Sequence, residues 1–295
     1  MRPSVSSSIL LVGALGALSG CATATADDPA DADAAQTHAF LRVDRVRDVG
    51  DEAATRARAS ATFLRTRDAA DPNVLARIVG AIPSLPSPGE CAAVDGSDAT
   101  LALHTLTPVE LAQAGDVTIV AGEASTPLVA RAYPDVAHLV SGVVYTTPDV
   151  TDGLLARDRR VVFHVAGSAD VPPFDAEVEV PMPIESVRVD GVALGEIAPA
   201  RGASPLAVSW QPVPDDDVYV DVAAGSGDRV ARFRCTPKVG ASDVVLVDPA
   251  TVGASVVGVT VHRVRSVAID GAPVTTGEVR FDTAVTGRVS FEPAG

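Results

Sequence analysis

Apolar and polar side chains alternate one by one along much of this 295-residue sequence. The alternation is clear at residues 57–63, 174–180, 206–211 and 218–222, where mostly valine and alanine take every second position. Successive side chains of a β-strand point to opposite faces of a sheet, so this period predicts strands with one buried face. The composition agrees, because the 47% of hydrophobic residues are mostly valine and alanine and only 4% of residues are aromatic. We therefore expect an all-β protein.

The strand pattern stops at Pro181-Met182-Pro183. Proline lacks the amide hydrogen that a central strand needs, so this segment favours a boundary between domains. Beyond it, seven or eight strand-like segments follow at intervals of about 8–15 residues, a spacing typical of an antiparallel sandwich. Within them, Asp190-Gly191 predicts a tight hairpin turn. We expect two antiparallel β-sandwich domains, at residues 38–181 and 182–295.

Residues 205–222 have the sequence PLAVSWQPVPDDDVYVDV. This segment resembles part of a fibronectin type III module, in which an l-x-V-x-W strand is followed by a proline turn and a strand with tyrosine. The resemblance implies an immunoglobulin-like or fibronectin III-like sandwich and no particular function, since such sandwiches carry many unrelated ones. Trp210 shares a strand face with Leu206 and Val208, which predicts a place in the core and not on a sugar-binding surface.

One motif in the first half favours a helix instead of a strand. Thr107-Pro108-Val109-Glu110 has the form of a capping box, with proline at the first helical position. It predicts one or two helical turns that end at Gly115.

The first 20 residues have the pattern of an export signal. Arg2 precedes an apolar run at residues 9–18, which suits a signal peptide and is too short to cross a bilayer. The run ends in Leu18-Ser19-Gly20-Cys21, which resembles the lipobox of bacterial lipoproteins. The resemblance implies cleavage before Cys21 and acylation of its thiol, with palmitate among the acyl groups. The alternative is an ordinary cleaved signal in which Cys21 is incidental.

The residues after the lipobox favour a flexible attachment to a membrane. Residues 21–37 are small, acidic and without apolar periodicity, so we expect a lipidated, disordered tether. Position 22 is alanine, whereas an aspartate there resembles the signal that keeps lipoproteins of enteric bacteria in the inner membrane. The outer membrane is therefore favoured, on its periplasmic or its surface face. The whole arrangement is similar to that of lipoproteins found in soil bacteria with large genomes.

Charge and cysteine content narrow the partners and the compartment. The formal net charge of −15 argues against nucleic acid, because phosphate binding needs a basic surface. If Cys21 is acylated, Cys91 and Cys235 remain of the three cysteines. In an oxidising compartment such a pair favours a disulfide, and the alternative is two buried, unreactive thiols.

The sequence contains none of the familiar hydrolase, zinc-protease or nucleotide-binding motifs. Its five histidines are scattered, with none three to five residues from another, so no local zinc site is expected. The carboxylates at residues 215–217 could offer oxygens to calcium, but without an EF-hand pattern a solvated turn is favoured. Glu177 and Glu179 share one strand face, which favours solubility over acid–base catalysis, and Ser226 lies in a glycine-flanked turn. We predict no enzyme, no cofactor and no bound metal.

These observations favour a lipid-anchored cell-envelope protein with a non-enzymatic structural or interaction role. The expected partners are the membrane, through the lipid, and an envelope protein or polysaccharide bound by loops or a sheet edge. One alternative is a carbohydrate-binding lipoprotein that uses exposed aromatic residues such as Tyr133, Tyr145 or Tyr219. The other is an envelope hydrolase whose site is assembled from residues distant in sequence.

Overall fold

Strands form nearly all the regular structure of the chain, and this confirms the all-β class. The computed structural model describes residues 36–50, 55–66, 71, 74, 76–77, 80, 82–94, 109–136, 140–148, 160–199, 204–213, 216–226, 229–248, 251, 254–269 and 273–292. The strands are β1 (Gln36–Val49), β2 (Thr55–Thr66), β3 (Cys91–Ala93), β4 (Val109–Leu111), β5 (Val117–Ala121), β6 (Ala124–Val136), β7 (Val140–Thr146), β8 (Arg160–Val165), β9 (Phe174–Glu179), β10 (Arg188–Val189), β11 (Val192–Ala193), β12 (Ile197–Ala198), β13 (Leu206–Ser209), β14 (Asp217–Ser226), β15 (Arg229–Cys235), β16 (Asp243–Leu246), β17 (Val256–Ala268) and β18 (Thr276–Phe291).

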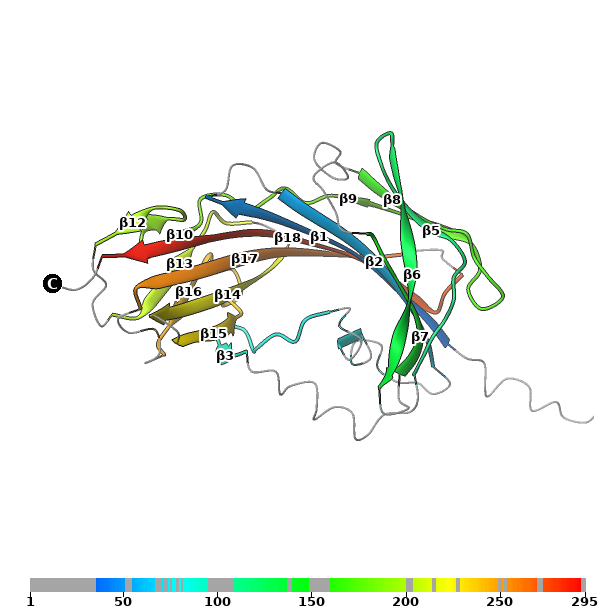
Figure 1. Ribbon diagram of the computed structural model, residues 1–295, viewed down its shortest axis with the longest axis horizontal. Coiled ribbons are helices and arrows are strands. Elements are labelled where there is room, and N and C mark those ends of the chain that lie inside the picture. The colour runs from blue at the N-terminus through cyan, green and yellow to red at the C-terminus, as the bar shows by residue number, and fades with distance from the viewer. Residues whose placement is uncertain are drawn as a thin grey trace, which may run out of the picture. The chain divides into compact units, whose positions relative to one another are not determined.

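The strands form two sheets (Figure 1). The larger has the order β3-β15-β14-β17-β18-β1-β2-β4-β7-β6-β5-β8-β9, and β12 pairs with β18 beyond the end of β1. The smaller has the order β11-β10-β13-β16. Long strands from opposite ends of the described chain meet in the middle of the large sheet, where β1 and β18 pair in parallel from His38↔Thr276 to Val49↔Gly287.

The alternation seen in the sequence produces two apolar cores. The first contains Ala59, Ala61 and Phe63 of β2 together with inward-facing residues of β5, β8 and β9. The second lies where the small sheet packs on β14, β15, β17 and β18. Strand β18 serves both, with Phe281 in the first core and Val289 in the second.

The expected domain boundary at residue 182 coincides with the change of core. Val180 belongs to the first core and Ile184 to the second. The large sheet nevertheless continues across both halves, because β18 pairs with β1 and β15 with β3. Residues 35–295 form one compact unit by their contacts. The division into two sandwich domains therefore stays a prediction.

The predicted hairpin at Asp190-Gly191 is confirmed. Val189 of β10 pairs with Val192 of β11, which leaves two residues in the loop. Their φ angles are 49° and 82°. Positive values at both central positions define a type I′ turn, whose twist matches that of the flanking strands.

The helix predicted from the capping box is wrong for the residues that the structure describes. Val109–Leu111 forms β4, in which Leu111 lies opposite Leu64 of β2 and Val109 pairs with Val140 of β7. A capping box is a local signal, whereas the neighbouring strands offer this short segment hydrogen bonds on both sides. Gly142 makes the close fit feasible, since a Cβ there would lie 2.1 Å from the carbonyl oxygen of Leu111.

The predicted signal peptide, Cys21 and most of the predicted tether lie outside the described residues. The last two residues of that predicted tether, Gln36 and Thr37, belong to β1. Within the described part of the chain, no helix is long and apolar enough to cross a membrane.

Candidate functional site

One face of the sheet formed by β15, β14, β17, β18 and β1 is polar. On β14, Val220 and Val222 belong to the second core, while Tyr219 and Asp221 alternate with them and face the other way. The sequence predicted this direction, but its expectation of an exposed Tyr219 is wrong, because only 2% of this residue is exposed. We define the polar cluster as the interacting side chains on this face: Arg42, Asp44, Tyr219, Asp221, Arg234, His262 and Asp282.

Asp282 is the centre of the polar cluster, and only 3% of its side chain is exposed. One carboxylate oxygen accepts a hydrogen bond of 2.8 Å from the Tyr219 hydroxyl. The other lies 2.8 Å from Nδ1 of His262. The Tyr219 and His262 rings stack with their centroids 4.1 Å apart and their planes at 8°. Two stacked rings therefore approach the same carboxylate, one to each oxygen.

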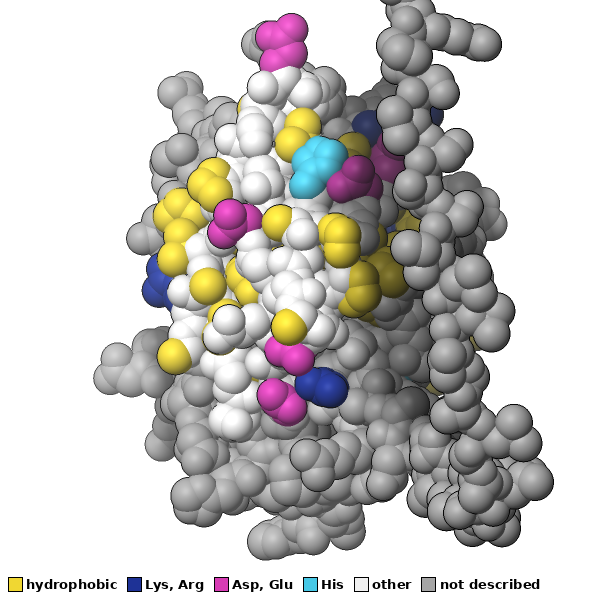
Figure 2. Space-filling view, turned by 90° about the vertical axis from the view of Figure 1, so that its right-hand side faces the viewer, with side chains coloured by type: hydrophobic (Ala, Val, Ile, Leu, Met, Phe, Trp, Pro, Cys, Tyr) yellow, Lys and Arg dark blue, Asp and Glu magenta, His cyan; other side chains and the backbone are white. Residues whose placement is uncertain are grey.

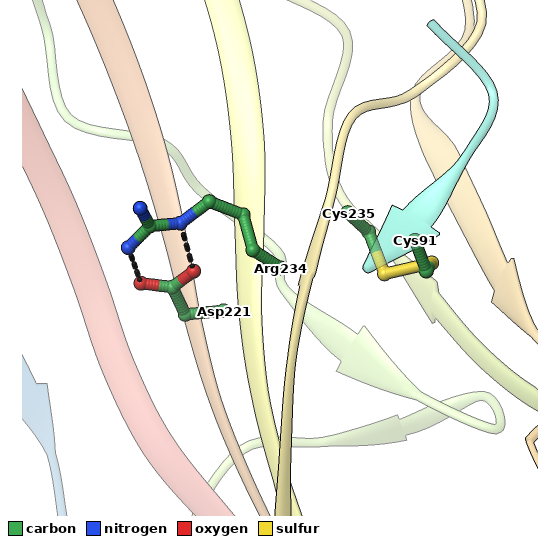
Figure 3. Close-up of a disulfide and its surroundings, with 4 residues drawn as sticks. All are labelled: Cys91, Asp221, Arg234 and Cys235. Carbon is green, nitrogen blue, oxygen red and sulfur yellow. Dashed lines mark hydrogen bonds and ion pairs between the residues drawn. A yellow bond between two sulfur atoms is a disulfide. The ribbon is translucent and has the colours of Figure 1, made fainter. Parts of the chain in front are cut away.

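His262 lies between two carboxylates. Its Nε2 is 3.7 Å from an oxygen of Asp221, opposite the nitrogen that faces Asp282. Asp221 also accepts two hydrogen bonds from Arg234, of 2.7 Å from Nε and 2.9 Å from Nη2 (Figure 3). This bidentate geometry gives a strong and directional ion pair. The guanidinium carbon of Arg234 lies 5.2 Å from the centre of the Tyr219 ring, within cation–π distance.

Arg42 extends the polar cluster onto β1. Its Nε lies 2.5 Å from Asp44, and its Nη2 lies 3.5 Å from Asp282. The parallel register aligns Arg42 with Arg280 and Asp44 with Asp282. Like charges therefore stand side by side on adjacent strands, and Arg42 bonds to one carboxylate on its own strand and to another on β18.

The aligned carboxyl groups have pKa values shifted in opposite directions. Burial alone would raise the pKa of Asp282, but the hydrogen bond and charge of His262, the Tyr219 hydroxyl and Arg42 together lower it. Burial raises the pKa of Asp44, and Arg42 offsets this only in part. Burial and then the charge of Asp282 raise the pKa of Tyr219. At neutral pH Tyr219 is therefore a neutral donor to an ionised Asp282.

The groups of the polar cluster are engaged with one another. Among the described residues no serine, threonine or cysteine side chain hydrogen-bonds to His262, whose nitrogens both face carboxylates. A histidine that activates a nucleophile needs one nitrogen directed at a hydroxyl or thiol. The described part of the chain also has no group of three or more His, Cys, Asp or Glu residues placed to hold a metal ion. Each ionisable group of the polar cluster is therefore bonded or close to another member of the same cluster.

Gly80 and residues 82–94 run past the polar cluster. The carbonyl oxygen of Gly80 accepts a hydrogen bond of 3.4 Å from Arg42, and that of Ser84 accepts one of 3.3 Å from Arg234. These two arginines therefore bind this segment as well as their carboxylates.

A disulfide between Cys91 and Cys235 joins the end of this segment to β15 (Figure 3). The two residues are direct partners of β3 and β15, and their Cα atoms are 4.0 Å apart. The amide of Thr236 donates to the carbonyl of Glu90 and that of Val94 to the carbonyl of Arg232, so by the alternation of an antiparallel pair Cys91 and Cys235 occupy a non-hydrogen-bonded position, where Cα atoms approach most closely. The pairing expected of these two cysteines is present in the structure.

A groove with a cavity volume of about 760 Å³ adjoins the polar cluster on the same face. One row across its floor has arginines at both ends and almost no side chain between them. In this arginine row Arg232 of β15 is aligned with Ala223 of β14, then with Gly258 of β17 and Arg288 of β18. All four residues line the groove.

The next row supplies oxygen atoms to the groove. In this hydroxyl row Asp221 is aligned with Thr260, then with Thr286 and with Asp48 of β1. The Thr260 and Thr286 hydroxyls are 2.9 Å apart. Because Asp221 belongs to the polar cluster and also lines the groove, the two features share one carboxylate.

The acidic segment 215–217 differs from the solvated turn predicted for it. Asp215 lies outside the described residues, and the Asp216 side chain is only 1% exposed. Its carboxylate accepts hydrogen bonds of 2.8 and 3.1 Å from Arg265 and a further one from Arg263. Both oxygens of the Asp216 carboxylate are therefore hydrogen-bonded to guanidinium groups.

The aromatic residues considered for sugar binding are mostly buried. Tyr145 is 3% exposed, and its hydroxyl accepts a hydrogen bond of 2.8 Å from the amide of Ala114. Together with Tyr219 it is therefore excluded as an exposed platform, while the side chain of Tyr133 lies outside the described residues. Trp210 is 5% exposed and belongs to the second core, as predicted.

The remaining candidate residues are not brought together. His104 and His138 lie outside the described residues, and the ring of His38 is buried, which lowers its pKa. His164 pairs with Asp175 on exposed strand faces. Glu177 forms an exposed ion pair with Arg160 at 2.7 Å, and Glu179 is exposed. The backbone of Ser226 pairs with Arg229 in a hairpin. None of these contacts forms a site.

No protein-family model matches the chain, and no curated protein matches it. One solved structure similar to it is titled "Fcho1 Mu homology domain (Danio Rerio) with bound Eps15 peptide", with 10% identity and a TM-score of 0.23 over 88% of this chain and 97% of that chain. A TM-score this low carries no argument about fold or binding.

Proposed function

We propose that this protein is an exported, lipid-anchored protein of the bacterial cell envelope with a structural or interaction role. The observation that carries the proposal is the Cys91–Cys235 disulfide between β3 and β15. Disulfides form and persist in oxidising compartments, which supports export. The lipobox-like residues 18–21 then support attachment through acyl chains on Cys21, most consistently to the outer membrane.

For the folded part of the chain we propose two sandwich-like halves that are joined by β1 and β18. The half that contains residues 205–222 is of fibronectin III type. Burial of Leu206, Val208 and Trp210 on one strand face supports this, because the resembling module places these positions in its core. On the coloured part of the face in Figure 2, hydrophobic side chains lie among white atoms, a few charged groups and one histidine, which supports a surface of mixed character.

A non-catalytic role is supported by the engagement of His262 with two carboxylates. Of the two alternative functions, carbohydrate binding is favoured by a specific observation, the polar groove beside the polar cluster. It would have to rely on charged and hydroxyl groups, because Tyr145 and Tyr219 are buried.

Metabolic labelling of cells with a palmitate analogue tests the anchor. Wild-type protein should carry the label, and Cys21→Ala protein should not. Cys91→Ala protein is the matched control, since it loses a cysteine of the folded body and should still be labelled. Protease treatment of intact cells then separates a surface from a periplasmic location. An unlabelled wild type, or equal labelling of the Cys21→Ala protein, would contradict the proposal.

A further inference from the structure

We propose that the groove beside the polar cluster binds an acidic saccharide, with the arginine row on its acid groups and the hydroxyl row on its hydroxyl groups. This inference rests on the proposed interaction role in the envelope and names the class of ligand. The acid group can be a carboxylate or a phosphate, since each presents a pair of anionic oxygens that a guanidinium group can bind.

The arginine row supplies the charge. Arg42 and Arg234 on the same sheet face are paired with carboxylates, whereas the side chains of Arg232 and Arg288 have no partner among the described residues. In a chain with a net charge of −15, two groove-lining cations without a carboxylate partner among the described residues are a specific feature. Guanidinium groups bind carboxylates and phosphates through two parallel hydrogen bonds, so each arginine could hold one acid group.

The floor between the two arginines is low enough for a ligand to lie against it. At Gly258 a Cβ atom would meet Cβ of Ala223 at 3.8 Å and Cγ of Arg288 at 3.9 Å. The stem of Arg288 therefore lies close to this floor, and only an alanine methyl group stands between the two charges. A strand spacing of about 4.8 Å puts the Arg232 and Arg288 Cα atoms about 14 Å apart, so a ligand bound by both arginines must be extended across the floor.

The rest of the groove favours a ligand with hydroxyl groups over a simple anion. Thr260 and Thr286 offer hydroxyls at the floor, while Asp48, Glu196 and Asp221 offer carboxylates. Carboxylates accept hydrogen bonds from sugar hydroxyls, which a simple anion such as phosphate lacks. The volume of about 760 Å³ lies within the range of ligand-binding pockets, about 300–1,000 Å³.

Asp221 is held in place before any ligand arrives. Arg234 binds both of its oxygens, and His262 lies 3.7 Å from one of them. A fixed acceptor costs less conformational entropy on binding than a mobile one. The polar cluster thereby gives the groove a pre-positioned carboxylate.

Calorimetric titration of the purified full chain tests the inference. The probes are short oligogalacturonates, a phosphorylated mannose oligosaccharide, neutral malto-oligosaccharides of matched length and inorganic phosphate. We expect one of the acidic saccharides to bind at least tenfold more tightly than the neutral ones and than inorganic phosphate. Comparison of the first two probes identifies the acid group.

Variants locate the binding. Arg232→Gln and Arg288→Gln should each weaken binding of the acidic probe about tenfold, since each removes charge-assisted hydrogen bonds. Gly258→Val should weaken binding of the acidic probe, because the valine side chain fills the floor of the groove. Arg131→Gln is the control: it makes the same arginine-to-glutamine change on the exposed surface of β6 and should leave binding unchanged. Thermal unfolding of all four variants should match the wild type, because the arginine row and the exposed Arg131 contribute little packing.

Equal affinity for neutral and acidic saccharides would overturn the inference, as would binding that survives both arginine changes. Phosphate that binds as tightly as the acidic saccharides would refute the saccharide part. The absence of binding by both acidic probes would also refute it. These outcomes are separate from the labelling test, which concerns only Cys21 and is performed in cells.

Discussion

The two faces of the β14–β17–β18 sheet bury their side chains by different means. The core face uses residues such as Val220, Val259 and Val285, which are stabilised by removal of apolar area from water. The polar face buries Tyr219 and Asp282. Each of them needs a hydrogen-bond partner, because a buried polar or charged group without one is costly. Loss of a side chain therefore leaves a cavity on the core face and an unsatisfied charge on the polar face.

The disulfide should give the largest effect, because it fastens the segment that runs past the polar face. Cys91 and Cys235 are 144 residues apart. Replacing both by alanine should lower the free energy of unfolding by up to about 5 kcal/mol in the chain-entropy model. Urea unfolding measures the loss, and hydrogen exchange should rise first at residues 82–94. An increase that is equal in the first core would contradict the link to the polar face.

The core face can be tested at Phe281, which is fully buried on β18 directly before Asp282. Phe281→Ala should cost about 4 kcal/mol, because it removes an aromatic ring and leaves a cavity. Phe281→Leu, which retains more of the volume, is the matched control and should cost less than half as much. A loss below about 1 kcal/mol for the alanine variant would show that this part of the core is loosely packed.

Asp282→Asn should cost about 2–3 kcal/mol at pH 7, since it removes the charge that His262 and Arg42 face and keeps the shape. Asp44→Asn, at the aligned position of β1, is the control and should cost much less, because burial already disfavours its charge. Chemical unfolding of both variants gives the comparison. Equal losses would show that the two carboxylates are equivalent.

The two carboxylates should also respond to pH in opposite ways. The lowered pKa of Asp282 means that its contribution is present above the unfolded value of about 3.9 and is lost as pH falls through the folded value. The raised pKa of Asp44 means that protonation between its folded value and about 3.9 favours the folded state. Asp282→Asn should therefore flatten the loss of stability below about pH 4. Asp44→Asn should remove the opposing trend above it.

The smallest effect is expected for Tyr219→Phe, about 1 kcal/mol. The change removes the hydrogen bond to Asp282 but keeps the stacking on His262 and the contact with Arg234. Tyr145→Phe, which removes a buried hydrogen bond in the first core, is a suitable comparison. If both cost the same, the charge of Asp282 adds nothing to the value of the bond.

The sequence predicted what depends on local alternation. The all-β class, the hairpin at Asp190-Gly191 and the buried position of Trp210 follow from the period of two and from turn chemistry. The helix predicted from Thr107-Pro108-Val109-Glu110 is wrong, because a motif of four residues carries no information about the strands that lie beside it in the fold.

The polar cluster could not be predicted in the same way. Its members come from five strands, and Arg42 meets Asp282 only because β1 and β18 are paired. The direction of Tyr219 followed from the pattern, but its burial depends on neighbours such as Arg234 and His262. Charged residues at alternating strand positions, as at Arg42 and Asp44, are the one local signal that could have suggested a buried polar face.

The pairing of β1 with β18 has a consequence for biogenesis. Residues about 238 positions apart must find each other before the middle of the large sheet exists, and such distant pairing makes folding slow. Synthesis must reach Phe291 before that sheet can be completed, so the emerging polypeptide stays without its final hydrogen-bond ladder until then. For the export that we propose, this delay leaves time for the chain to pass through a translocation channel while it is still extended.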